Sequence, residues 1–535
     1  MQDAAAAVRP GLSADLKEAF RAIVGADNVR DDEASLELVS EDVWTRSTQT
    51  AVLIVAPNSL EQLSTVVTTA HRAGMAIAPR GAGMSYTSAY LPVTDNTLSL
   101  DLTRMNRILA ISPEDMTVTV EAGCTWLALN DALAAKGLRT PFWGPMSGIY
   151  STIGGGLSQL NAMFGAGQYG TSSESMIAMT VVLGDGQILR TGARGPDGDT
   201  PFYRHFGPDI AGLFCGDSGT LGIKAEITMR LIRRPAFEDS ASFSFKSGEA
   251  ILQALAEITR AGIAAETCGF DPGLTKVRMK RVSLMSDVKT LGAVIGKEKS
   301  IGKGLFAAAK IALGGRNFVE EDEYPLHVNV EGRSKEAVAA DMAALRRIAK
   351  QFDGREIENT IAKVIRAVPF PAPNSILGPE GESWVPVHGN VSLSNAPKMF
   401  ADILAYFETM QPRFDRHAIH NGFLFTSMST NAITIEPVFF WPEGYRPVHA
   451  SMVEPAHLAR LKQLGPNPAA TAVVEEAREG IKAICRRYGA AHFQIGRSYP
   501  YRESRDPATL TLLDAIKGIT DPANQFNPGG LGFPQ

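Results

Sequence analysis

The stretch PRGAGMSYTSAY, residues 79–90, places two glycines two positions apart directly after an apolar run. Small residues and free backbone N–H groups in a tight loop can bind an anion such as a diphosphate. The dinucleotide fingerprint G-x-G-x-x-G needs a third glycine and a following helix. Tyr86 occupies the third glycine position, strand-like residues follow, and no Walker A sequence is present. We therefore expect a diphosphate-binding loop outside the Rossmann and P-loop folds, held mainly by main chain.

Two further glycine-rich stretches follow, GPMSGIYSTIGGGLSQLNAMFGAGQYG at 144–170 and LFCGDSGTLGIKAEITMRL at 213–231. Glycine lets the backbone approach a flat or charged ligand closely, and packing alone accounts for only a few of these residues. Between them, MIAMTVVLGDGQILRTG predicts two strands joined by a Gly-Asp-Gly turn. The three clusters are thus expected to line one ligand site.

An α/β arrangement positions the first loop. A helix beginning near Ser13 or Asp15 precedes a strand at 51–56, an amphipathic helix at 59–74 and a second strand that leads into the loop. From about 236 to 480, strands alternate with amphipathic helices. This pattern predicts an α+β domain with a mostly antiparallel sheet.

Composition limits the class of protein. A chain of 535 residues with 44 % apolar and 20 % charged residues is expected to form several globular domains. The net charge of −5 gives no reason to expect a nucleic-acid partner. Four scattered cysteines indicate neither a zinc ribbon nor a redox dithiol. No secretory signal or membrane-spanning run is visible, so the sequence predicts a soluble, cytoplasmic protein.

Residues 276–316 carry ten Lys or Arg against two acidic residues. The plainer interpretation is a solvated insertion. The alternative is a weak membrane-surface or partner-binding patch, since basic amphipathic segments suit anionic surfaces.

The ordered set PRGAGMSY, STIGGG, GDGQILRTG, GTLGI and DPANQFNPGGLGF resembles the FAD-binding flavoproteins typified by vanillyl-alcohol oxidase and p-cresol methylhydroxylase. The resemblance covers most of 50–235 and returns at 521–533. It implies an N-terminal helical segment at 1–44, an FAD-binding domain at 45–235, a cap domain at 236–489 and a C-terminal segment at 490–535 that completes the FAD domain and the active site. It also implies a homodimer, and molecular oxygen or an electron-acceptor protein as oxidant.

By the same resemblance, backbone N–H groups of the first loop wrap the diphosphate, and later residues follow the dinucleotide to the adenine side. The implied cofactor contacts are Pro79, Arg80, Gly81, Ala82, Gly83, Met84, Ser85, Pro145, Gly148, Ser151, Thr152, Gly155, Tyr169, Gly170, Gly222, Ile223, Arg502 and Asn527.

Many relatives attach FAD covalently through a histidine in the slot that Met84 fills here. A thioether cannot form that bond. A second attachment uses a cap histidine or tyrosine, for which His388 is a displaced match, and a structural histidine is the favoured interpretation. We therefore expect non-covalent FAD.

In the phenol-oxidising branch a tyrosine followed by arginine binds the phenolate oxygen, and Tyr501–Arg502 supplies this pair. A cation and a phenol donor lower the pKa of the substrate hydroxyl. The implied reaction transfers hydride from the benzylic carbon of a para-substituted phenol or aromatic alcohol, lignin-derived for example, to flavin N5, through a quinone methide. The structural alternative pairs Arg502 with an acid such as Glu503 or Asp506.

Two departures put the phenol assignment in doubt. Thr171 stands where this branch has an aspartate, and a second phenolate-binding tyrosine must be Tyr86 or Tyr90 at a shifted register. The acid–base work would then fall to a histidine, among which His388, His420 and His492 are candidates, each more often structural. Tyr501, Arg502, Tyr86 and His388 are accordingly the predicted catalytic residues.

The main alternative is a 2-hydroxy-acid dehydrogenase of the D-lactate or glycolate type from the same superfamily. An arginine would then bind a carboxylate and a histidine would take the hydroxyl proton. His327 and Glu331, four apart on a strand, could bind the metal that some such members use. The glycine-rich His-Gly-Asp-Gly-Asn signature is absent, so no metal is predicted. A third alternative is a flavin-binding scaffold without activity, against which the retained glycine clusters argue.

Overall fold

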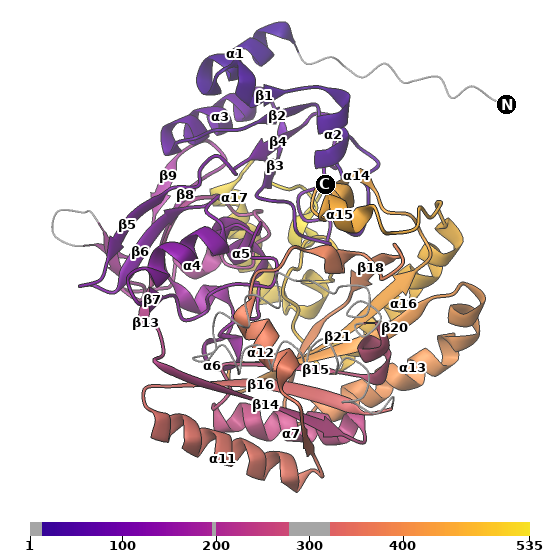
Figure 1. Cartoon of the computed structure of the whole chain (residues 1–535). Coiled ribbons are helices and arrows are strands. Elements are labelled where there is room, and N and C mark those ends of the chain that lie inside the picture. Colours follow the sequence, from indigo (N-terminus) through magenta and orange to yellow (C-terminus); the bar gives the residue numbers. More distant parts are fainter. Residues whose placement is uncertain (1–12, 195–199, 278–321) are drawn as a thin grey trace.

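The computed structural model describes residues 13–194, 200–277 and 322–535. Helix α1, Ala14–Val24, begins at Ser13, whose hydroxyl accepts a hydrogen bond from the Leu16 N–H. It packs on α3, Leu60–Arg72, at the N-terminal end of the molecule (Figure 1). Beneath them lies a four-stranded sheet of order β1-β2-β4-β3, in which β4 pairs in parallel with β2 and β3. Its strands are Val29–Arg30, Leu53–Val55, Ala76–Arg80 and Thr97–Asp101 for β1 to β4.

A second, antiparallel sheet has the order β5-β6-β12-β8-β9. Helices α4, Trp126–Ala134, and α5, Ile153–Gln159, pack with it around a core of Trp126, Phe142 and Phe164. Two short strand pairs join β7 to β13 and β10 to β11. The strands are Ile108–Ser112, Thr117–Glu121, Leu138–Arg139, Met176–Val182, Ile188–Arg190, Ala193–Arg194, Pro201–Tyr203, Ile223–Arg230 and Ile232–Arg233 for β5 to β13.

The third sheet has the order β17-β14-β16-β15-β20-β21-β18, with β19 also paired to β21, and every pairing is antiparallel. This confirms the predicted α+β cap with its mostly antiparallel sheet. The strands are Phe237–Phe245, Glu266–Phe270, Tyr324–Gly332, Arg355–Ile357, Ser383–Pro386, Gly389–Ser392, His420–Met428 and Ala432–Trp441 for β14 to β21.

One face of this third sheet is covered by helices that share its apolar core. Residues alternate between the two faces of a strand, so Phe423, Phe425, Ile433 and Ile435 enter the core while their neighbours point to the opposite face. Figure 1 shows α7 and α11 beside β14 and β16. The covering helices are α7 Gly248–Ala261, α11 Lys335–Gln351, α13 Ala396–Arg416 and α16 Pro468–Arg487.

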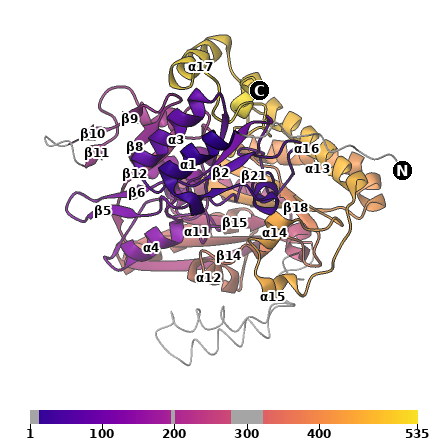
Figure 2. The ribbon, with the colours of Figure 1, turned by 90° about the horizontal axis from the view of Figure 1, so that it is seen from above.

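The C-terminal segment returns to the N-terminal half. Helix α17, Pro507–Thr520, lies at the edge of the molecule in the view from above (Figure 2). The chain after it pairs with β3, since the Ile77 N–H donates to Gln525 O at 2.7 Å and the Asn527 N–H donates to Ile77 O at 3.0 Å. The remaining short helices are α2 Glu33–Val39, α6 Ala166–Tyr169, α12 Thr360–Ala367, α14 Pro447–Ala450 and α15 Pro455–Leu458.

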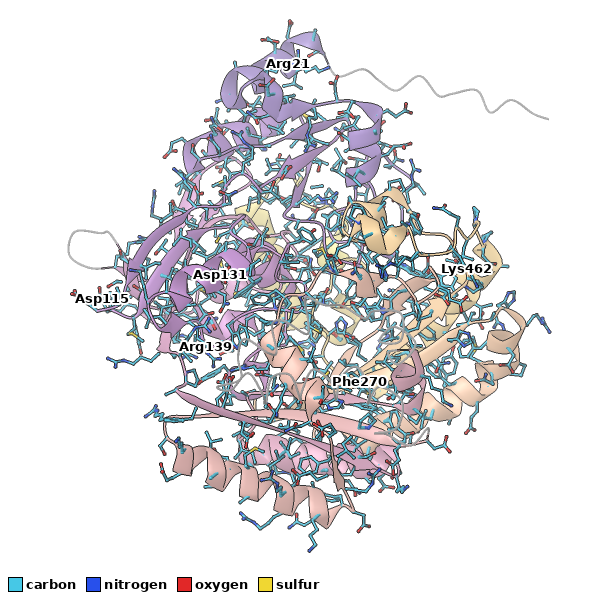
Figure 3. The ribbon with its side chains drawn as sticks, viewed as in Figure 1. Arg21, Asp115, Asp131, Arg139, Phe270 and Lys462 are labelled. Atoms are coloured by element: carbon cyan, nitrogen blue, oxygen red, sulfur yellow. The ribbon has the colours of Figure 1, made fainter. Side chains whose placement is uncertain are left out.

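Buried ion pairs connect the two-stranded sheet of β7 and β13 to the third sheet. The Arg139 guanidinium on β7 forms two hydrogen bonds of 2.7 and 2.6 Å to the Glu331 carboxylate on β16. Arg366 on α12 joins the same carboxylate and also donates to Glu266 Oε1 at 2.7 Å. Figure 3 marks Arg139 where the two sheets meet. Charges removed from water need such partners, so this cluster ties the two halves together.

Within the described residues, no helix is both long and apolar enough to span a bilayer. Nearly all of the basic segment predicted at 276–316 lies outside the described residues.

Candidate functional site

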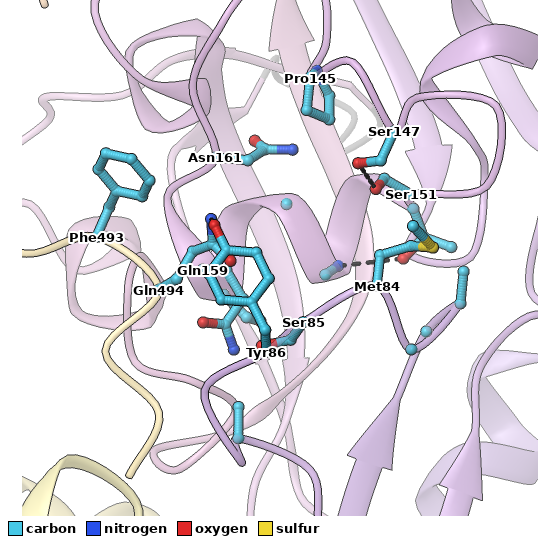
Figure 4. Close-up of a pocket in the computed structure, with 18 of the residues that line it drawn as sticks. Met84, Ser85, Tyr86, Pro145, Ser147, Ser151, Gln159, Asn161, Phe493 and Gln494 are labelled. Carbon is cyan, nitrogen blue, oxygen red and sulfur yellow. Dashed lines mark hydrogen bonds between the residues drawn. The ribbon is translucent and has the colours of Figure 1, made fainter. Parts of the chain in front are cut away.

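A cavity of about 350 Å³ lies between the two sheets of the N-terminal half and the third sheet. Its walls come from the glycine loop after β3, from α5 and both of its ends, from residues 218–224, from a roof at 371–376 and from β20 and β21. Figure 4 shows the part around Met84, Tyr86 and Gln159. Residues from widely separated stretches of the sequence therefore converge on one space.

The glycine loop is shaped so that side chains cannot replace its glycines. A Cβ added at Gly81 would come within 2.4 Å of Thr152 Oγ1. Gly83 has φ +72°, and a Cβ there would lie 2.3 Å from the Arg80 guanidinium. The Tyr90 hydroxyl fixes the loop by donating to Gly83 O at 2.6 Å. Thr152 and Arg80 therefore impose glycine at these two positions, and the loop so shaped lines the cavity, where its backbone can bind an anion.

Most of the predicted cofactor contacts do line this cavity. They are Pro79, Arg80, Gly81, Ala82, Gly83, Met84, Ser85, Pro145, Ser151, Thr152, Gly155, Gly222 and Ile223. Tyr86, predicted as catalytic, lines it as well.

Four predicted cofactor residues lie behind the wall instead. Gly148 packs beneath the roof, because a Cβ there would meet the Phe370 ring at 2.4 Å. Tyr169 and Gly170 belong to the end of α6 and do not line the cavity. Asn527 supports the wall indirectly, since its side-chain amide donates to the carbonyl of Ser218, a lining residue, at 2.7 Å.

Tyr501 and Arg502 are not brought to the cavity. The Arg502 guanidinium forms two hydrogen bonds, 2.7 and 2.9 Å, to the Asp514 carboxylate on α17 and lies over the Phe533 ring. Tyr501 packs against the apolar side of the same region. The structure thus places this pair away from the cavity and gives Arg502 an acidic partner, Asp514, other than Glu503 or Asp506.

His388 is fully buried behind the cavity wall. Its ring stacks on Phe493, a lining residue, with centroids 3.9 Å apart, and its Nδ1 accepts from the Tyr499 hydroxyl at 3.2 Å. Burial, and secondly the neighbouring His492, lower the pKa of His388 to about 3. The enclosed His388 ring does not line the cavity and instead supports Phe493, which does.

The cap side of the cavity is formed by residues that sequence reasoning missed. Alternate residues of β20 and β21 point here, opposite the helix-covered face. Gln494 Nε2 donates to the Tyr86 hydroxyl at 2.8 Å, and Tyr86 meets Trp384 edge to face at 5.5 Å. Desolvation, and secondly the Glu436 carboxylate, raise the pKa of Tyr86 well above its usual value. The cap-side lining is Trp384, Leu424, Thr426, Thr434, Glu436, Phe493 and Gln494.

The residues of the 2-hydroxy-acid alternative lie elsewhere. His327 Nδ1 is 2.8 Å from the Ser242 hydroxyl, and Glu331 belongs to the buried ion cluster. Neither residue lines the cavity. Among the described residues, no group of three or more His, Cys, Asp or Glu side chains is placed to hold a metal ion.

The cavity walls fit a flavin dinucleotide. The glycine loop offers backbone without side chains, as a diphosphate requires. The side-chain oxygens of Gln159 and Asn161 are buried at the wall without a hydrogen-bond partner, and so are ready for the polar groups of a ligand. The fold and this cavity together define an FAD-binding protein.

Comparison with protein families agrees. Residues 51–192 match the FAD binding domain, and residues 495–531 match the C-terminal domain of FAD linked oxidases. These two matches confirm the resemblance to FAD-binding flavoproteins seen in the sequence.

Relatives of known sequence match about half of the chain or less. The chain is 30 % identical over 259 residues to the glycolate oxidase subunit GlcD of Bacillus subtilis, covering 48 % of this chain and 53 % of the relative. It is 32 % identical over 213 residues to the D-lactate dehydrogenase [cytochrome] 1 of Saccharomyces cerevisiae, covering 39 % and 35 %. The matched region thus spans between about a third and a half of each relative's length.

Solved structures share the fold over nearly the whole chain. Substrate-bound p-cresol methylhydroxylase aligns with a TM-score of 0.71 at 16 % identity, covering 97 % of this chain and 96 % of the other. The 4-ethylphenol oxidase from Gulosibacter chungangensis in complex with isoeugenol aligns with a TM-score of 0.70 at 17 % identity, covering 98 % and 99 %. An alkyldihydroxyacetonephosphate synthase has a TM-score of 0.70 at 18 % identity, covering 98 % and 86 %.

Proposed function

We propose that this protein is an FAD-dependent oxidoreductase that oxidises the benzylic carbon of a small aromatic alcohol or para-substituted phenol. The observation that carries the proposal is the composition of the cap-side lining. It offers the aromatic rings of Trp384 and Phe493, neutral hydrogen-bonding groups and one carboxylate, Glu436. Aromatic walls with a few placed polar groups suit a flat, uncharged ligand.

The charges around the cavity favour this substrate over a 2-hydroxy acid. A substrate carboxylate needs a cation for recognition, and the described cap-side lining contains no lysine, arginine or histidine. The cationic lining residues, Arg80 and Lys224, belong to the glycine-loop side, and Lys224 donates to the Asp217 carboxylate at 2.6 Å. The Glu436 carboxylate would in addition repel an anion.

Tyr86, Gln494 and Glu436 together provide the hydrogen bonds that would bind the polar groups of the substrate. The high pKa of Tyr86 keeps its hydroxyl protonated. It accepts from Gln494 and can therefore donate its own proton to a substrate oxygen. Glu436, on the same side, can accept a hydrogen bond from a substrate hydroxyl. Bound FAD supplies the two-electron acceptor.

The comparisons support both candidate substrates at different levels. The structures that share the fold include proteins named for p-cresol and 4-ethylphenol. The sequence relatives are named for glycolate and D-lactate, which keeps a 2-hydroxy acid as the second candidate. The composition of the cap-side lining favours the aromatic compound.

Anaerobic reduction of the flavin tests the proposal. The purified yellow protein is mixed in turn with 4-hydroxybenzyl alcohols, 4-alkylphenols, D-lactate and glycolate, and bleaching of the flavin absorbance is followed. Bleaching by an aromatic compound is expected. Bleaching by D-lactate or glycolate and by none of the aromatic compounds would overturn the proposal and establish the second candidate. Glu436→Gln should selectively improve reaction with any anionic analogue, because it removes the repelling charge.

We further infer that FAD is bound without a covalent link, because Met84, which lines the cavity, stands where the resemblance places the histidine of one covalent linkage. Acid precipitation should leave a colourless pellet, and a yellow pellet would contradict this. Admitting air after anaerobic bleaching distinguishes oxygen from a protein electron acceptor. The cytoplasmic location, expected from the sequence, and the homodimer, implied by the resemblance, remain predictions.

A further inference from the structure

The turn that ends α5 presents two side-chain amides to the cavity. Leu160 ends the helix with φ 52°, a left-handed conformation that is costly for a residue with a Cβ. The residues on either side of it, Gln159 and Asn161, both line the cavity. Gln494 is also left-handed, with φ 53°, and its N–H donates to Gln159 O at 2.7 Å. Two unfavourable backbone conformations thus meet at one point of the wall, as is common at ligand sites.

The amide oxygens of both residues lack a partner. Gln159 Oε1 and Asn161 Oδ1 are buried from solvent and accept no hydrogen bond within the described residues. Asn161 itself is 8 % exposed, and its amide packs so closely on Gly156 that a Cβ there would come within 2.7 Å. A buried acceptor without a donor is destabilising. In a fold that retains two of them at a cavity wall, the missing donors are expected on a ligand.

We propose that Gln159 and Asn161 are cofactor-positioning residues whose side-chain oxygens accept hydrogen bonds from donor groups of the bound flavin. The oxidised ring has one N–H, and the ribityl chain carries hydroxyls, so these are the donors available to them. In Figure 4, Gln159 lies close to Tyr86 and Gln494, and Asn161 lies on the other side of α5. The two acceptors thus approach a ligand from different directions and fix its orientation. The proposal rests on FAD binding and is independent of the substrate.

Isosteric substitutions test this without measuring turnover. Gln159→Met and Asn161→Leu remove the acceptors while keeping most of the volume, and Gln159→Glu and Asn161→Asp keep an acceptor oxygen. The FAD dissociation constant is measured by refilling flavin-depleted protein, together with the flavin absorption spectrum and the melting temperature with and without FAD. Gln253→Met, on the exposed side of α7, is the matched control, because that amide already donates to Glu249.

Each acceptor loss should weaken FAD binding roughly tenfold and shift the flavin spectrum, while the FAD-free protein melts at the same or a higher temperature. That combination distinguishes a ligand contact from a structural one. Gln159→Glu and Asn161→Asp should retain more of the affinity, and the control should behave as the parent. Unchanged FAD affinity in both acceptor-loss variants would overturn the proposal. So would an affinity loss accompanied by a lower melting temperature of the FAD-free protein.

Discussion

Tyr86 joins the glycine loop to the cap side of the cavity, whereas Arg502 is paired on the surface of α17. Tyr86→Phe removes the hydroxyl that would bind the substrate oxygen and leaves the Trp384 contact in place. We expect flavin reduction by an aromatic substrate to slow by about tenfold to a thousandfold. Arg502→Ala is expected to change the rate less than twofold. Anaerobic stopped-flow absorbance compares the two, and a larger effect of Arg502→Ala would contradict the assignment.

His388 makes the stability of the protein depend on pH in a defined window. Its folded pKa of about 3 lies below the unfolded value of 6.5. Between these two values His388 is protonated in the unfolded chain and neutral in the folded protein. The stability that this residue contributes above pH 6.5 is therefore lost as the pH falls toward 3. Between pH 6.5 and 5 this amounts to roughly 2 kcal/mol.

His388→Phe preserves stacking on Phe493 and removes the titrating group. The free energy of unfolding is measured with urea at several pH values. The value for the parent minus the value for the variant should fall by about that amount as the pH falls from 6.5 to 5. A difference independent of pH would show that His388 is not held neutral. The same comparison isolates His388 from other buried groups with lowered pKa values, such as His449 and His492.

At the scale of elements, the loop between β3 and β4 depends on its glycines for shape. Gly83→Ala would add strain at φ +72° and place a Cβ against Arg80. Gly74 is a matched control, because it also has positive φ, +63°, but nothing lies within 4 Å of an added Cβ. Both substitutions should cost about 1 kcal/mol or more in stability. Only Gly83→Ala should weaken FAD binding, by more than tenfold as judged by flavin retention on gel filtration. Equal flavin retention by the Gly83 and Gly74 variants would contradict the role of the glycine loop in binding the diphosphate.

The elements also explain what the sequence could predict. Glycines at close backbone approaches leave a local signal at 79–85, and the family resemblance pointed to Thr152 and Gly155; all of these residues line the cavity. The residues of the cap-side lining leave no such signal in the local sequence. Glu436 and Trp384 sit on ordinary alternating strands, and only the register of the third sheet shows which face they take. Gln494 reaches the cavity through a left-handed turn that no motif marks.

The position of Tyr501 and Arg502 could not be predicted from the sequence for the same physical reason. Helix α17 lies between this pair and the C-terminal motif and supplies Asp514 as the partner of Arg502. Gly148 was assigned to the cofactor because of its cluster, yet it accommodates Phe370 of the roof. A glycine in the sequence indicates that something lies close to the backbone at that position. The sequence alone does not show whether it is a ligand or a neighbouring side chain.

At the scale of the whole molecule, the cavity exists because the third sheet is held against the N-terminal half. Arg139 and Glu331 each have side chains only 3 % exposed, and they span that boundary. Arg139→Met would leave Glu331 with Arg366 as its remaining cation. Loss of one partner of a buried pair is expected to cost about 3–5 kcal/mol. The exposed pair Arg346–Glu356 has a similar two-bond geometry, and Arg346→Met should cost at most about 1 kcal/mol.

Comparing Arg139→Met with Arg346→Met distinguishes the loss of contact between the third sheet and the N-terminal half from the loss of any one ion pair. If the cluster holds the third sheet against the N-terminal half, Arg139→Met should lower the urea midpoint. It should also speed flavin release, because the roof and the cap-side lining would move together with the third sheet. Arg346→Met should alter neither, since its pair lies within the third sheet and α11. Equal effects of both substitutions would mean that the boundary is held by apolar packing, with the buried charges contributing little beyond surface pairs. A stable Arg139→Met protein that releases flavin faster would instead place the cluster's role in closing the cavity.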